Sequence, residues 1–192
     1  MDRIKERIKL AERQAEMLKN VDQAELDAMV DAILGAERIF VTGWGRAGNN
    51  IKMMSMDCSQ IGLSTHVIGD NSCPSMTDKD ILIIGSGSGG TKSMLLFANQ
   101  AKAHGSKIGL IVATRGSELE KLADVTVHIL DDVIIGQGYR PKEGTVTPEE
   151  ALVQGNAFYP VMQTVCDVIQ SYCAEQLGVT PEDIGRNHNN IE

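Results

Sequence analysis

Residues 81–91 contain the types of side chain that bind a phosphate group. Four aliphatic residues, typical of a buried strand, lead into a turn of four glycines and two serines, and a helical sequence follows Thr91. A strand that ends in such a turn and continues as a helix points several backbone N–H groups toward one place, where the helix dipole adds about half a positive charge. The hydroxyl groups of Ser86, Ser88 and Thr91 are further donors. The sequence therefore predicts an anion site, and the phosphate of a small metabolite is the expected anion.

A second glycine-rich turn follows an earlier predicted strand. Residues 43–48 read Gly-Trp-Gly-Arg-Ala-Gly, which is the spacing of a dinucleotide-binding turn, and Asp70 lies after the next strand, where an acidic residue would bind ribose. A dinucleotide enzyme is therefore one interpretation. Two glycine turns at one edge of a parallel sheet instead favour a short ligand with a phosphate at one end. The turn at 85–91 also lacks the lysine and the spacing of a P-loop.

The two turns lie within an alternation of predicted strands and helices. Strands are expected at 38–42, 65–68, 81–84, 107–112 and 125–129, and helices at 47–61, 90–103 and 117–122. Strands that alternate with helices in this way form a parallel sheet covered by helices on both faces. The sequence therefore predicts an α/β fold with both glycine turns at the carboxyl edge of the sheet.

Helices are also predicted at both ends of the chain. An apolar stripe at helical spacing runs over residues 3–20, and Asp22 and Glu25 have the spacing of a capping box at the start of a second helix. A last helix is expected over about 148–177, after an irregular connection at 131–148, and a polar tail follows it.

The composition excludes several classes of function. The 192 residues carry a net charge of −8, which argues against a nucleic-acid-binding surface and gives no reason to expect binding to an acidic membrane. No apolar run approaches the ~20 residues that a membrane span needs. The cysteines form no CxxC pair, and no histidine–cysteine–carboxylate cluster has ligand spacing, so no metal site is expected. The expected compartment is the cytoplasm.

Three motifs in order resemble those of the sugar isomerase (SIS) domain family: the turn at 43–48, the turn at 85–91 and Lys-Leu-Ala-Asp at 121–124. Within that family the pattern is most similar to that of the 6-phospho-3-hexuloisomerases. The resemblance implies a flavodoxin-like three-layer αβα sandwich with a five-stranded parallel sheet. It also implies a phosphosugar isomerase that needs no metal or cofactor and works as a dimer or tetramer with sites shared between subunits. We expect a single SIS domain over 1–192, with N-terminal helices at 1–35, an αβ core at 37–130 and a C-terminal helix and tail at 148–192.

The resemblance also assigns roles to individual residues. The phosphate is expected to contact the hydroxyl groups of Ser86, Ser88 and Thr91 and the backbone of Gly87, Gly89 and Gly90, and Gly45 and Arg46 of the first turn belong to the same substrate-binding set. Trp44, inside the first turn, is expected to line the crevice or a contact between subunits.

The catalytic residues of the family pattern are not all present. Moving a carbonyl along a sugar requires a base that removes a proton beside it and donors that stabilise the enediolate. Where the hexuloisomerase pattern has serine, glutamate and glutamate, this chain has Ala47, Gly90 and Tyr159. Two interpretations follow. The chain isomerises a phosphosugar with other groups, or it binds a phosphosugar without turnover, as a sensor.

Two residues are candidates for the missing base. Glu150, near the start of the last helix, has a suitable carboxylate, although capping of the helix explains this residue as well. His188 matches the histidine of the family's tail motif, and histidine exchanges protons near neutral pH. A polar tail is able to reach a neighbouring subunit, so His188 is the leading candidate.

Overall fold

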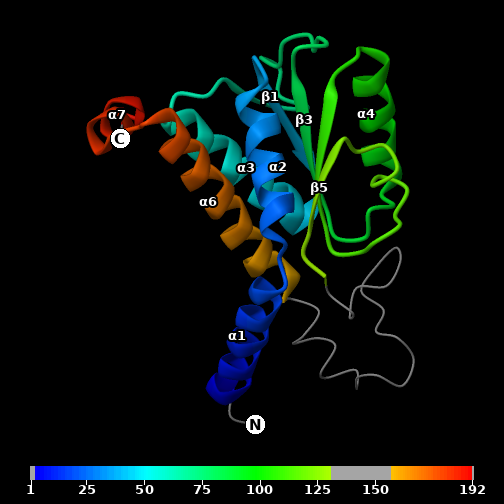
Figure 1. Cartoon of the computed structure of the whole chain (residues 1–192), viewed down its shortest axis with the longest axis vertical. Helices are drawn as coiled ribbons and strands as arrows, with labels where there is room; N and C mark the ends of the chain where they lie inside the picture. Colours follow the sequence, from blue (N-terminus) through cyan, green and yellow to red (C-terminus); the bar gives the residue numbers. More distant parts are fainter. Residues whose placement is uncertain (1–2, 131–156, 192) are drawn as a thin grey trace.

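A parallel sheet of five strands lies at the centre of the molecule (Figure 1). The structure is a computed structural model that describes residues 3–130 and 157–191. Its strands are β1 (Ile39–Gly43), β2 (Thr65–Val67), β3 (Ile81–Ser86), β4 (Lys107–Val112) and β5 (Val125–His128), in the spatial order β2-β1-β3-β4-β5 with every neighbouring pair parallel. This arrangement confirms the predicted α/β fold.

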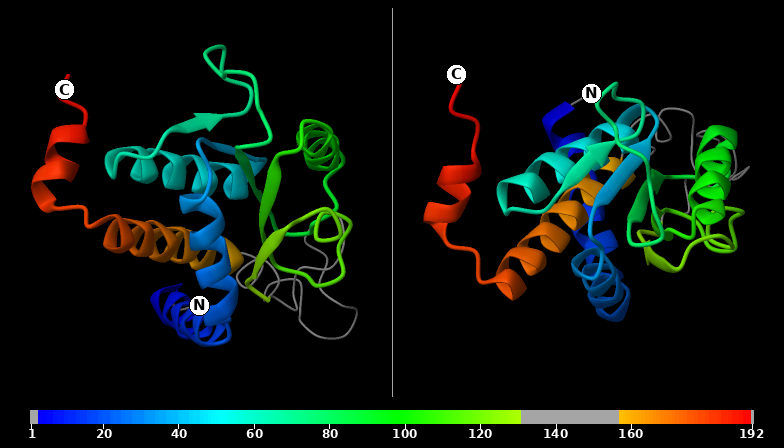
Figure 2. Two further views of the ribbon diagram at one scale, coloured as in Figure 1. Left: turned by 45° about the horizontal axis from the view of Figure 1, so that its top comes forward. Right: turned by 90° about the horizontal axis from the view of Figure 1, so that it is seen from above.

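Helices cover both faces of the sheet. α2 (Gln23–Leu34), α3 (Gly45–Gln60) and α6 (Phe158–Leu177) lie on one face, and α4 (Lys92–Ala103) lies on the other (Figure 2). α1 (Arg3–Lys19) extends away from the sheet and contacts α6. The result is the three-layer αβα sandwich that was expected. Within the described ranges, no helix is both long and apolar enough to cross a bilayer.

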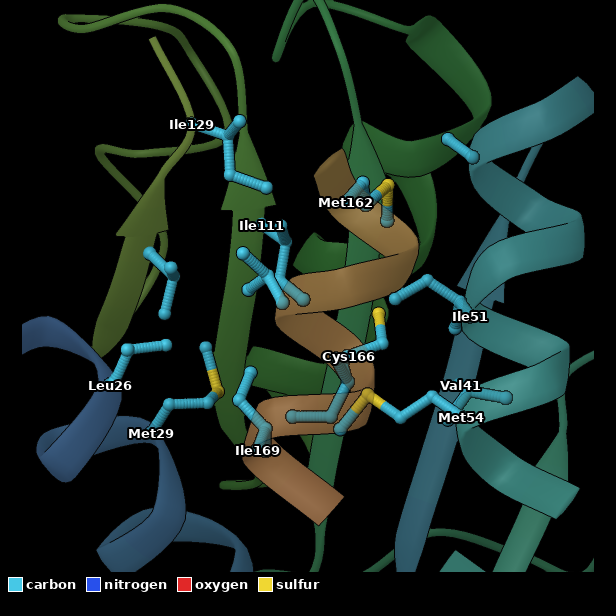
Figure 3. Packing of buried hydrophobic residues seen from close by; sticks show 14 of the residues in the cluster. Leu26, Met29, Val41, Ile51, Met54, Ile111, Ile129, Met162, Cys166 and Ile169 are labelled. Carbon is cyan, nitrogen blue, oxygen red and sulfur yellow. The ribbon is translucent and has the colours of Figure 1, made fainter. Parts of the chain in front are cut away.

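Alternate side chains of the strands fill two hydrophobic cores. Along β3, Ile81 and Ile83 belong to the core shared with α2, α3 and α6, whereas Leu82 and Ile84 belong to the core under α4. In Figure 3, side chains of α6 such as Cys166 lie between those of α2 and α3. Burial of one large aliphatic side chain stabilises a fold by about 1.5–3 kcal/mol, so both cores hold β3 in place.

Two segments differ from the prediction for physical reasons. β3 continues to Ser86 because Gly85 and Ser86 pair with β4, although small residues have little intrinsic preference for strands. Residues 118–122 form turns in place of the predicted helix. Asp124 N already donates to Ile108 O of β4 at 2.8 Å, so the chain joins the sheet before a second helical turn can form.

Of the capping box predicted at the start of α2, the Asp22 cap is confirmed and the contact from Glu25 back to the cap is wrong. Asp22 is the N-cap, and its carboxylate accepts a hydrogen bond from Ala24 N at 2.8 Å. Glu25 does not turn back to the cap, because its carboxylate binds His128 at the end of β5. The spacing of the two acidic residues therefore serves two separate contacts.

The polar tail contains a short helix, α7 (Pro181–Asn187). It begins at a capping box between Thr180 and Asp183. It contacts the end of α3, where Asn187 Nδ2 donates to Gln60 O at 3.0 Å. α6 and α7 together carry the chain away from α1, toward the opposite end of the molecule (Figure 1).

Candidate functional site

Both glycine turns lie at the carboxyl ends of β1 and β3. Gly43, the last residue of β1, pairs with Gly85 of β3, so the two turns begin side by side. After β1 the chain enters α3 on one face of the sheet, and after β3 it enters α4 on the other face. Ligands of open α/β sheets bind in the crevice that forms where the chain leaves neighbouring strands toward opposite faces. The candidate site is this crevice.

The serine-rich turn leaves its hydroxyl groups able to donate. Ser86 Oγ accepts a hydrogen bond from Gly89 N at 3.2 Å, and Ser88 Oγ accepts one from Gly90 N at 3.4 Å. A serine hydroxyl that accepts a hydrogen bond keeps its own O–H for another partner. Ser86 is only 4% exposed and supports the turn from inside. Ser88 is half-buried and is the more accessible donor of the two.

Helix α4 begins directly after this turn. Thr91 is its N-cap, but the Thr91 side chain accepts no hydrogen bond from the helix. The N–H groups of the first helical turn are therefore not satisfied by the cap side chain, and the helix dipole favours a negative charge beside them. Backbone donors and hydroxyl groups thus meet at one point, which is the arrangement that binds phosphate at helix N-termini.

Gly89 fixes the turn against the segment that follows β4. Its φ of +63° lies in the left-handed region, and a Cβ on this residue would stand 2.2 Å from Ser117 Oγ. The Gly89 carbonyl accepts a hydrogen bond from Leu119 N at 2.9 Å. Only glycine fits at this position, so the neighbouring segment sets where the turn lies.

A buried histidine ties that segment to α2. His128 Nδ1 lies 2.8 Å from Glu25 Oε1, and His128 Nε2 lies 3.0 Å from Glu120 Oε1. The ring therefore bridges Glu25 of α2 and Glu120 of the segment after β4. Glu120 also accepts a hydrogen bond from Ser117 N at 3.2 Å, and Ser117 packs on Gly89. This hydrogen-bonded group therefore supports the serine-rich turn.

The first glycine turn reaches across to α4 through an exposed tryptophan. Trp44 is 64% exposed, yet its Nε1 donates to Ser93 Oγ at 2.6 Å. The following residue, Gly45, has a φ of +58° and open space beside it. The indole therefore joins the first turn of α3 to the first turn of α4 at the carboxyl edge of the sheet.

Arg46 and Tyr159 meet where α3 and α6 begin. The Arg46 guanidinium lies 4.0 Å from the centre of the Tyr159 ring, and Asn50 Nδ2 donates to the Tyr159 carbonyl at 2.6 Å. Met162, one turn further along α6, packs closely on Gly85 of β3, because a Cβ added to Gly85 would collide with the Met162 side chain. The start of α6 therefore lies against the strand that leads into the serine-rich turn. Burial raises the pKa of the Tyr159 phenol, although Arg46 opposes this shift. Tyr159 is therefore a hydrogen-bond donor, in the position where the family pattern has glutamate.

No close contact requires glycine at position 90, where the family pattern has glutamate. A Cβ added to Gly90 would meet nothing within 4 Å. A side chain at this position would therefore begin in open space. Ala47, at the serine position of the family pattern, is 4% exposed and lies in the core on the α3 side of the sheet.

Within one chain, His188 lies far from the serine-rich turn. It is the C-cap of α7 and is exposed. α7 contacts Gln60, the last residue of α3, whereas the crevice lies at Gly45, the first residue of α3 (Figure 1). α3 has 16 residues and is about 24 Å long, so its two ends are far apart. The structure therefore does not bring His188 to Ser88 in the same chain. Glu150 lies outside the described residues.

Sequence reasoning missed the residues that support the turn. Ser117 and Glu120 have the spacing of a capping box, and they form one: Ser117 N donates to Glu120 Oε2 and Glu120 N donates to Ser117 Oγ, both at 3.2 Å. That signal was present in the sequence. No sequence signal pairs Glu25 with His128, which are 103 positions apart.

Residues 32–141, more than half of the chain, match the SIS domain. The chain belongs to the SIS domain family. The 3-hexulose-6-phosphate isomerase of Mycobacterium gastri is 28% identical over 178 residues, which cover 93% of this SIS protein and 85% of that enzyme. An uncharacterised protein of Methanothermobacter thermautotrophicus is 36% identical over 121 residues, and that match spans 63% of this chain and 61% of the relative.

A solved structure extends the likeness beyond the matched residues. A hypothetical protein of Methanococcus jannaschii, for which a 3-hexulose-6-phosphate isomerase function was inferred from the crystal structure, aligns with a TM-score of 0.77 at 25% identity. The alignment covers 97% of this chain and 99% of that one. The likeness to this structure therefore includes elements outside 32–141.

Proposed function

We propose that this SIS domain is a phosphosugar isomerase that acts on a hexulose phosphate. The serine-rich turn carries the proposal, because hydroxyl and backbone donors meet there at the start of α4. Relatives named 3-hexulose-6-phosphate isomerase, which align with about nine-tenths of the chain, support the choice of substrate.

The crevice suggests a role for each group in the reaction. Ser88, Thr91 and the first N–H groups of α4 hold the phosphate, which fixes the sugar along the crevice. Arg46 and the phenol of Tyr159 donate to the oxyanion of the enediolate. A base then removes the proton from the hydroxyl-bearing carbon beside the carbonyl and returns it to the former carbonyl carbon. The hydroxyl proton passes from the new carbonyl oxygen to the old one, so the carbonyl moves by one position.

We further propose that His188 of a second copy of the chain supplies this base. His188 is exposed at the end of the molecule away from its own crevice, a position from which it is able to reach a neighbour's site in a symmetric dimer or tetramer. Glu150 is the weaker candidate for the base.

His188→Ala is expected to abolish turnover while leaving the affinity for the phosphosugar within about twofold, since His188 does not hold the phosphate. At a phosphosugar concentration well below the KM of Ser88→Ala, dimers assembled from equal amounts of His188→Ala and Ser88→Ala chains are expected to recover about a quarter of wild-type turnover, because half of them contain one intact shared site out of two. Steady-state kinetics on the separate and mixed variants measures both effects. Full activity of His188→Ala, or no recovery in the mixture, would contradict the shared site.

The whole chain is proposed to form one SIS domain in a reducing compartment. α1 and α6 contribute residues to the same hydrophobic core as β1 and β3, which supports a single domain. The four cysteines are free thiols, which suits a reducing compartment such as the cytoplasm.

Ser88→Ala is expected to weaken phosphosugar binding by about 1–3 kcal/mol, because a hydrogen bond to a charged group is lost. Isothermal titration with fructose 6-phosphate and with inorganic phosphate measures the loss. Ser171→Ala is a matched control, since the Ser171 hydroxyl donates to Asp167 O on the exposed side of α6. Unchanged affinity of Ser88→Ala for both ligands would remove the turn from the site.

A second candidate function is binding without turnover. Ala47, Gly90 and Tyr159 remove a hydroxyl and two carboxylates relative to the hexuloisomerase pattern, and this favours a phosphosugar sensor. The sensor and the isomerase use the same turn for the phosphate. They differ in whether a proton beside the carbonyl exchanges with solvent.

A further inference from the structure

A cavity of about 420 Å³ lies beside the first glycine turn, between β1 and β2 and not between β1 and β3. Its wall includes Trp44, Gly45 and Lys52 from the first glycine turn and α3. Ile68 and Asp70 from the segment after β2, and Phe97 from α4, also line it. None of residues 85–91 lines it. The volume falls in the range of small-molecule sites, about 300–1,000 Å³. Trp44, Lys52 and Asp70, which take no part in the proposed function, therefore line a cavity that residues 85–91 do not line.

The three glycines of this turn have the three roles that a nucleotide-binding turn requires. A Cβ on Gly48 would lie 2.3 Å from Gly43 O, so the first and third glycines permit the close approach of α3 to β1. Gly45 has a φ of +58° and nothing within 4 Å of its Cβ position, which leaves the backbone open to a ligand. The Trp44 side chain does not cap α3, so the first N–H groups of this helix lack a side-chain cap.

The cavity also holds groups that recognise a planar ring and hydroxyls. The Trp44 indole is exposed but held by its hydrogen bond to Ser93, so it is a fixed surface for stacking. The Asp70 carboxylate makes no hydrogen bond or ion pair to any residue within 3–130 and 157–191, and it lies after β2, where a carboxylate accepts hydrogen bonds from ribose. Lys52 is likewise unpaired among those residues and adds a positive charge to the same cavity.

We propose that this cavity is a second ligand site that binds a nucleoside or its monophosphate. The base lies against Trp44, with Ile68 and Phe97 behind it, and the ribose hydroxyls donate to Asp70. The phosphate, where present, lies between Lys52 and the first N–H groups of α3. The site is separate from the phosphosugar turn, so the proposal does not depend on the proposed function, and it includes no redox step.

The single tryptophan of the sequence makes the proposal directly measurable, because Trp44 lines the cavity. Adenosine, adenosine monophosphate and inorganic phosphate are titrated into the full chain while tryptophan fluorescence is followed, with calorimetry as a second readout. We expect saturable quenching by the two adenosine compounds and none by inorganic phosphate. The monophosphate is expected to bind more tightly than adenosine, and Lys52→Ala is expected to remove that difference.

Two further variants locate the site. Asp70→Asn is expected to lower the affinity for adenosine about tenfold, as loss of a charged hydrogen-bond acceptor does, whereas Ser88→Ala is expected to bind adenosine like the wild type. Asp70 is exposed, so its substitution leaves the fold intact. Three results would overturn the proposal: no saturable binding of either adenosine compound, wild-type affinity in Asp70→Asn, or equal losses in Asp70→Asn and Ser88→Ala.

Discussion

Gly89→Ala is expected to lower the affinity for a phosphosugar about a hundredfold. A Cβ at this position would lie 2.2 Å from Ser117 Oγ, so either the turn or the segment at 117–119 must shift. The shift misaligns the donors beside α4. Complete loss of two charge-assisted hydrogen bonds costs about 3–6 kcal/mol. A hundredfold lower affinity corresponds to about 2.8 kcal/mol, which is the cost of weakening both bonds without losing them completely. Isothermal titration with a hexose phosphate measures the change.

Gly178→Ala is the matched control for this substitution. Gly178 has a φ of +65°, almost the same as the +63° of Gly89, but a Cβ there would meet nothing within 4 Å. Both variants therefore carry the cost of a left-handed backbone, about 1–2 kcal/mol, and only Gly89→Ala also carries the collision with Ser117. Equal affinities in the two variants would show that the turn does not hold the phosphate.

Glu25→Ala is expected to lower the free energy of unfolding by about 2–3 kcal/mol. The Glu25 carboxylate accepts hydrogen bonds from His128 N and from His128 Nδ1, and the His128 side chain is 6% exposed. Loss of the carboxylate leaves these His128 N–H groups without their partner, which costs about 1–3 kcal/mol for each buried group, and the 20% exposure of Glu25 reduces that cost. At about 2–4 °C per kcal/mol, the melting temperature falls by about 4–12 °C.

Glu37→Ala tests whether the effect comes from burial. Glu37 pairs with Lys79 at 2.9 Å, but the two side chains are 61% and 65% exposed. An exposed pair of this kind contributes about 0–1 kcal/mol, so little change in melting temperature is expected. Thermal unfolding followed by circular dichroism compares the two variants, and equal shifts would show that the buried cluster has no special contribution.

Local sequence pattern was sufficient for most of the fold and for the position of the serine-rich turn. The strand predicted at 107–112 has the same bounds as β4 in the structure. The turn after β3 was visible because glycine and serine follow an aliphatic run, and this composition is typical of a phosphate-binding turn. Pairing with β4 then extended β3 over Gly85 and Ser86, an effect of the sheet that local preference does not contain.

The support of the turn could not be predicted because it depends on contacts between distant parts of the chain. Glu25 has the spacing of a local cap, and only the fold shows that its carboxylate binds His128. Trp44 and Ser93 are 49 positions apart, and their hydrogen bond forms because β1 and β3 are neighbours in the sheet. A pattern read along the chain gives the elements, whereas such contacts follow from how the elements pack.

Exchange of a substrate proton with solvent tests the central proposal most directly. The chain is incubated in deuterium oxide with 3-hexulose 6-phosphate or fructose 6-phosphate, and proton NMR follows deuterium incorporation beside the carbonyl. An enediolate intermediate predicts incorporation together with interconversion of the two sugars, and Ser88→Ala is expected to slow both. Tight binding of these phosphosugars to the wild-type chain, with neither incorporation nor interconversion, would contradict isomerisation and identify the protein as a binding protein.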